Sequence, residues 1–72
     1  MGNPMKISAR NQLHGTIADV HKGATTAHVV IDVGGAMLTA SITNEAVDQL
    51  KLVKGQKAYA VIKASDVMVG ID

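Results

Sequence analysis

Cysteine, tryptophan and phenylalanine are absent from the 72-residue sequence, and Tyr59 is its only aromatic residue. The absence of cysteine excludes disulfide bonds and thiolate metal sites. Without these, a chain of this length folds around a marginal core, because below roughly 80 residues too little surface is buried on folding. We therefore expect self-association to supply additional stability.

Excess charge and long apolar runs are also lacking. Seven basic residues against six acidic ones give a formal net charge of +1, which is too balanced to attract nucleic acid by electrostatics alone. No apolar run approaches the ~20 residues that span a bilayer, and the N-terminus has no signal-peptide pattern. We expect a cytoplasmic protein with neither nucleic acid nor membrane as a partner. A single domain over residues 1–72 is expected, and Met5 is an alternative start that would make residues 1–4 an extension.

The residues that are present alternate in the manner of a small all-β domain. Apolar and polar side chains alternate over 25–33 and again over 36–42, and the Gly34–Gly35 pair between them predicts a hairpin. Residues 43–50 change to helical spacing, with Thr43 or Asn44 as the N-cap. Five strands are expected, at 16–20, 25–33, 36–42, 57–63 and 67–71. The prediction is an all-β fold, a five-stranded OB-like barrel with one short helix between strands 3 and 4.

The last two expected strands are apolar on both faces. In 57–63 the side chains of Ala58, Ala60 and Ile62 oppose those of Tyr59 and Val61, and segment 67–71 has the same character. A strand that is apolar on both faces in so small a domain indicates a subunit interface.

Signatures of catalysis are missing. The sequence has no cysteine nucleophile, no phosphate-binding glycine loop followed by Lys-Ser/Thr, and no obvious pair of carboxylates. We therefore expect no enzymatic activity.

Three histidines, His14, His21 and His28, recur at intervals of seven, which on a long helix would suggest a metal site. The segment is predicted as strands instead. With the hairpin tip placed at Lys22–Gly23, His28 falls opposite residue 17 or 18, roughly 10 Å or more from His14, and His21 lies in the turn. The expectation is three separate, partly exposed histidines and no metal site.

Hydrogen-bond donors are concentrated in residues 6–13, which include Arg10, the only arginine in the chain. A guanidinium presents a planar fork of N–H donors with a permanent charge, which suits a tetrahedral oxyanion, and the Ser8 hydroxyl can add a further donor. From the residues alone, a surface arginine beside a turn is the more common explanation. Asn11 and Gln12 are expected to fix the turn around Arg10 rather than to touch a ligand.

Two segments resemble the molbindins, the small molybdenum-pterin-binding (Mop) proteins of the TOBE group. Residues 8–12 read Ser-Ala-Arg-Asn-Gln and are followed by Leu13 and Gly15, and residues 61–68 read Val-Ile-Lys-Ala-Ser-Asp-Val-Met. The resemblance extends over 5–71. It implies an OB-like fold, a homohexamer built as a trimer of dimers, and molybdate or tungstate bound between subunits. No organic cofactor is expected, because no aromatic pair is available to hold a pterin.

The resemblance also implies the site residues. By position these would be Ser8, Arg10, Lys63 and Ala64 from one subunit, and Thr43 and Ala46 from a second, the last through its backbone N–H. All of them are donors, and molybdate oxygens only accept hydrogen bonds. The implied function is non-enzymatic binding of molybdate or tungstate for intracellular storage and homeostasis.

Two alternatives remain at this point. An OB-fold can bind single-stranded nucleic acid, although aromatic stacking platforms and a basic groove are usual there and this chain has one tyrosine. The chain could also be a molybdate-responsive regulatory module that acts with a separate partner.

Overall fold

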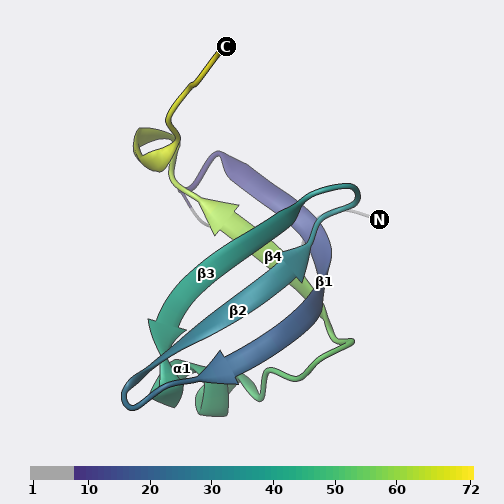
Figure 1. The fold of residues 1–72 in the computed structure, drawn as a ribbon, viewed down its shortest axis with the longest axis vertical. Coiled ribbons are helices and arrows are strands. Elements are labelled where there is room, and N and C mark those ends of the chain that lie inside the picture. Colours follow the sequence, from purple (N-terminus) through teal and green to yellow (C-terminus); the bar gives the residue numbers. More distant parts are fainter. Residues whose placement is uncertain (1–7) are drawn as a thin grey trace.

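The computed structural model describes residues 8–72, so the alternative start at Met5 and the extension before it lie outside the described residues. Four antiparallel strands form one curled sheet, and α1 lies at one end of it (Figure 1). In chain order the elements are β1 (Asn11–Lys22), β2 (Thr26–Asp32), β3 (Met37–Thr43), α1 (Asn44–Leu50), β4 (Lys57–Ile62) and the 3-10 helix η1 (Ala64–Asp66). The sheet order is β3-β2-β1-β4. The all-β class and the position of the helix between the third and fourth strands are therefore confirmed.

The first strand is much longer than the expected 16–20, because it pairs with two neighbours in succession. Its first half pairs with β4, from Asn11 opposite Ile62 to Thr16 opposite Lys57. Its second half pairs with β2, and the register shifts between Ile17 and Asp19. Such a bulge increases the local twist, which helps the sheet to curl.

Of the two predicted hairpin turns, one lies where it was expected and the other does not. The Gly34–Gly35 turn is confirmed: both residues have positive φ, 85° and 105°, and the Val33 N–H donates to the Ala36 carbonyl at 2.9 Å. Positive φ at both central positions favours glycine.

The expected position of the first turn is wrong. The Gly23 N–H donates to the Thr26 carbonyl at 2.7 Å, so the tip falls between Ala24 and Thr25 rather than at Lys22–Gly23. His28 consequently lies opposite His21, not opposite residue 17 or 18.

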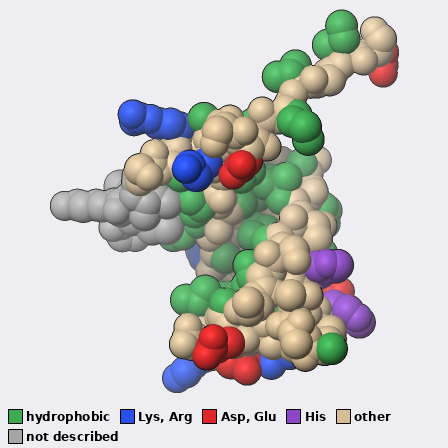
Figure 2. Space-filling model, turned by 90° about the vertical axis from the view of Figure 1, so that its left-hand side faces the viewer, with side chains coloured by type: hydrophobic (Ala, Val, Ile, Leu, Met, Phe, Trp, Pro, Cys, Tyr) green, Lys and Arg blue, Asp and Glu red, His purple; other side chains and the backbone are tan. Residues whose placement is uncertain are grey.

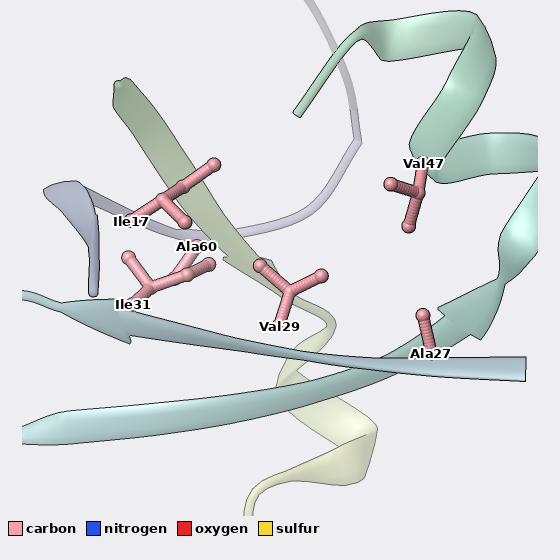
Figure 3. Packing of buried hydrophobic residues seen from close by; sticks show 6 residues of the cluster. All are labelled: Ile17, Ala27, Val29, Ile31, Val47 and Ala60. Carbon is pink, nitrogen blue, oxygen red and sulfur yellow. The ribbon is translucent and has the colours of Figure 1, made fainter. Parts of the chain in front are cut away.

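The core lies on the concave face of the sheet, where α1 also packs (Figure 3). Six hydrophobic side chains are buried there: Ile17, Ala27, Val29, Ile31, Val47 and Ala60. Val47 is the contribution of α1 and is only 3% exposed. The helix ends at Lys51, which adopts the left-handed conformation with φ 53°.

The expected fifth strand is not confirmed within a single chain. Among residues 8–72, the segment 67–72 pairs with no strand and projects away from the sheet as a largely hydrophobic tail (Figure 2). Met68, Val69 and Ile71 are each more than 90% exposed. A strand needs a neighbour for its N–H and C=O groups, and here the tail has none.

The curled sheet is open on its concave side between β3 and β4. A hollow of about 510 Å³ lies between β3 and β4 over the concave face, and most of its lining is apolar, including Leu38, Ile42, Leu52 and Ala58.

Within the described part of the chain, no helix has the length and apolar character needed to cross a membrane.

Candidate oxyanion site

Ser8 and Arg10 lie in the segment that leads into β1, and both side chains are exposed. Two neighbouring amides hold this segment. The Gln12 Nε2 donates to the Ala9 carbonyl at 3.1 Å, and the Asn11 Nδ2 donates to the Ile62 carbonyl at 3.3 Å. Gln12 therefore holds the turn around Arg10, as predicted, whereas Asn11 ties the start of β1 to the end of β4. The Arg10 guanidinium extends from this anchored backbone.

Lys63 and Ala64 lie at the same end of the sheet as Arg10. Because Asn11 is paired with Ile62, Arg10 and Lys63 are the next residues beyond the end of the β1–β4 ladder. Lys63 is exposed and occupies the N-cap position of η1, whose first residue is Ala64. The structure thus places Ser8, Arg10, Lys63 and Ala64 at one end of two adjacent strands.

Asp66 is the nearest carboxylate in sequence to these cations. Its backbone N–H donates to the Lys63 carbonyl at 2.9 Å, which makes it part of the η1 turn. Among residues 8–72, this end of the sheet carries the cationic side chains of Arg10 and Lys63, and Asp66 is close to Lys63 in the sequence.

Thr43 and Ala46 lie at the other end of the sheet, where β3 passes into α1. Thr43 is the N-cap of α1, and its Oγ1 accepts a hydrogen bond from the Ala46 N–H at 3.0 Å. This settles the choice between Thr43 and Asn44 as the cap. The Ala46 N–H is therefore already bonded within the chain, whereas the Thr43 hydroxyl retains its proton as a donor.

Asn44 has a role that the sequence analysis missed. Its N–H donates to the Thr25 carbonyl and its Nδ2 to the Gly23 carbonyl, both at 2.9 Å. These bonds tie the start of α1 to the β1–β2 turn and so fix the position of Thr43. No local signal predicts them, because the partners are about twenty residues apart in the sequence.

The two groups of candidate residues do not meet within one chain. Arg10 precedes the first residue of β1, and the β1–β2 turn that holds α1 follows the last, so the 12 residues of β1 separate them. At about 3.3 Å per residue this strand is more than 30 Å long. Figure 1 shows the same separation, with η1 at the top and α1 at the bottom. A single ion cannot touch both groups in one chain.

The sequence matches one domain family and is similar to a curated protein over that protein's whole length. The TOBE domain family matches residues 7–69. A probable molybdenum-pterin-binding protein of Haemophilus influenzae is 48% identical over 69 residues, which cover 94% of this chain and the whole of that protein.

Two solved structures have the same fold. A molybdate-binding protein from Sporomusa ovata superposes with a TM-score of 0.88 at 42% identity, covering 93% of this chain and all of that one. The cytoplasmic molybdate-binding protein ModG, solved with molybdate bound, has a TM-score of 0.89 at 41% identity over 96% of this chain, which spans 50% of the ModG chain.

The match to the family covers most of the chain, and full-length relatives share both its sequence and its fold. The resemblance in residues 8–12 and 61–68 therefore reflects common ancestry. The chain belongs to the TOBE domain family, as a member of its molbindin group.

Proposed function

We propose that this protein binds molybdate or tungstate without catalysing a reaction, and holds the ion between subunits of a cytoplasmic homo-oligomer for storage and homeostasis. The relatives support the ligand, because they are named for binding molybdenum-pterin or molybdate. The observation that supports the intersubunit arrangement is that the candidate donors of one chain lie at opposite ends of its sheet.

In the proposed site, each ion lies between two chains. One chain contributes the Ser8 hydroxyl, the Arg10 guanidinium, the Lys63 ammonium and the Ala64 N–H. A second chain contributes the Thr43 hydroxyl and the start of α1 around Ala46. Because the Ala46 N–H already donates to Thr43, the threonine hydroxyl is the main donor from this second chain.

The chemistry of this donor set favours a fully deprotonated oxyanion. Molybdate at neutral pH only accepts hydrogen bonds, so every donor finds an acceptor. Phosphate keeps a proton near neutral pH, and a pocket of donors leaves that proton unpaired, which costs affinity. Sulfate has no such proton, but its bonds to oxygen are shorter, so its oxygens would not reach every donor at once.

Assembly is supported by two complementary surfaces. The tail 67–72 is largely apolar and pairs with no strand of residues 8–72, and the hollow between β3 and β4 is largely apolar and open. We propose that segment 67–71 becomes the fifth strand of the OB-like barrel when chains associate, with the tail of one chain covering the open side of another. Exchange of such an element is a common route to closed oligomers. The proposed oligomer is a homohexamer arranged as a trimer of dimers.

Titration calorimetry with molybdate in an excess of sulfate tests the ligand, on protein whose oligomeric mass is known from light scattering. We expect saturable binding with at least about one ion per chain. Arg10→Ala should remove most of the affinity, and Arg10→Lys should leave an intermediate affinity because the charge remains but the fork is lost. Lys54→Ala, which also removes one exposed cation, is the matched control and should bind normally. Unchanged binding by Arg10→Ala would exclude Arg10 from the site.

Mixing two defective variants tests whether two chains share a site. Arg10→Ala and Thr43→Ala are unfolded together and refolded as a mixture. If one site takes Arg10 from one chain and Thr43 from another, about one quarter of the sites in a random mixture are intact and binding returns in that proportion. No recovery in mixed oligomers would show that both residues act within one chain or that one of them is not in the site.

A further inference from the structure

His21 and His28 are directly opposite each other on β1 and β2. Both side chains are exposed, and Ser41 of β3 lies opposite His28 on the other side, so the three residues form a row across the sheet. The sequence spacing of seven did not indicate this pairing, because the pairing depends on the register of the hairpin.

Both imidazoles project from the same face of the sheet. Their neighbours in the strands, Val20 and Val29, are also paired and face the core, where Val29 is 2% exposed. Side chains alternate between the two faces, so His21 and His28 point to the convex, solvent-exposed face. Directly opposed residues have Cβ atoms about 4.5–5.5 Å apart. Two imidazoles at that separation can reach one ion at the usual metal–nitrogen distance of about 2.0–2.1 Å.

We propose that His21 and His28 form a surface site for a divalent transition-metal cation such as Zn²⁺, Ni²⁺ or Cu²⁺. Neutral imidazole is a preferred ligand of these ions and a poor one for Mg²⁺ or Ca²⁺. Within residues 8–72 no group of three or more His, Cys, Asp or Glu side chains could hold a metal, so water fills the other coordination positions. The Ser41 hydroxyl is placed to hydrogen-bond such a water. The site is therefore open, and the ion exchanges readily.

The surroundings do not oppose a cation. Lys22, which follows His21, points to the other face, where its ammonium pairs with the Asp48 carboxylate of α1. Arg10 and Lys63 lie at the other end of β1. The cation site shares no residue with the proposed oxyanion site, and its existence does not depend on that function.

The experiment is a titration of the full chain with Zn²⁺, followed by calorimetry and by the histidine ring signals in proton NMR. We expect one ion per chain, with the ring signals of His21 and His28 shifting and those of His14 unchanged. Cu²⁺ should bind more tightly than Zn²⁺, and Mg²⁺ should not bind. Acidification that protonates the imidazoles should release the ion.

Single histidine substitutions test which side chains bind the ion. His21→Ala and His28→Ala should each weaken Zn²⁺ binding about tenfold or more, because a single imidazole lacks the second ligand. The matched control is His14→Ala, since His14 lies on β1 opposite Tyr59 of β4, with the two rings edge-to-face at 4.7 Å. This variant should bind Zn²⁺ as the unmodified chain does. Undiminished Zn²⁺ affinity in either single variant, or an equal loss in His14→Ala, would overturn the proposal. Circular dichroism of the variants, whose replaced side chains are exposed, checks that folding is intact.

Discussion

Gly15 of β1 passes so close to Asp32 of β2 that no side chain fits between them. A Cβ added at Gly15 would lie 2.6 Å from the Asp32 carbonyl oxygen and 2.7 Å from the Ile31 Cγ2. The first of these atoms belongs to the backbone of the adjacent strand and cannot move by rotation of a side chain. The close approach therefore requires glycine at the point where β1 passes from β4 to β2.

Gly15→Ala should destabilise the fold by about 1–3 kcal/mol, because the added methyl group forces the two strands apart. Urea denaturation followed by circular dichroism measures the change in the free energy of unfolding. Gly70→Ala is the control, since a Cβ there meets no atom within 4 Å. Equal stability of the Gly15→Ala variant and the unmodified chain would contradict the predicted overlap.

Thr43→Ala should cost about 1 kcal/mol of stability, because it removes the oxygen that accepts the Ala46 N–H at the start of α1. Thr43→Ser keeps that oxygen and should retain most of the stability. The same denaturation experiment compares the two variants. If serine and alanine at this position are equally destabilising, the effect comes from the lost methyl group and not from the cap.

Lys51→Gly should stabilise the protein by up to about 1 kcal/mol. Lys51 ends α1 with φ 53°, a conformation that costs energy for a residue with a Cβ and little for glycine. Lys54→Gly removes a similar exposed side chain at a position without positive φ and should be neutral or slightly destabilising. The midpoints of thermal unfolding of the two variants give the comparison. A midpoint for Lys51→Gly at or below that of Lys54→Gly would be the contrary result.

The double substitution Val69→Asp and Ile71→Asp should reduce the oligomeric mass and leave the fold of one chain intact. Both side chains are more than 90% exposed within a single chain, so replacing them removes no internal contact. In the proposed oligomer they lie in an apolar hollow, where an unpaired charge is costly. Light scattering measures the mass and circular dichroism the strand content. Val53→Asp, at an exposed valine outside the tail, should keep the full mass. An unchanged mass for the tail variant would exclude the tail from the interface.

The sequence alone determined the local elements. Alternation of apolar and polar residues identified β2 and β3, and a short segment that is apolar on both faces identified β4. The change of period identified α1, and paired glycines identified the turn between β2 and β3. These features depend on residues within a few positions of each other, so local preferences suffice to predict them. The bond from Gln12 to Ala9, beside Arg10, was predictable for the same reason, because its partners are three residues apart.

The tertiary structure decided the features that depend on pairing between distant segments. The length of β1 follows from its pairing with two strands. The opposition of His21 and His28 follows from the position of the β1–β2 turn, which the sequence pattern misplaced by two residues. Segment 67–71 has the composition of a strand, but a strand forms only where another backbone offers hydrogen bonds. The candidate oxyanion residues were named from sequence, while their separation at the two ends of β1 emerged only from the fold, because strand length and sheet order set it.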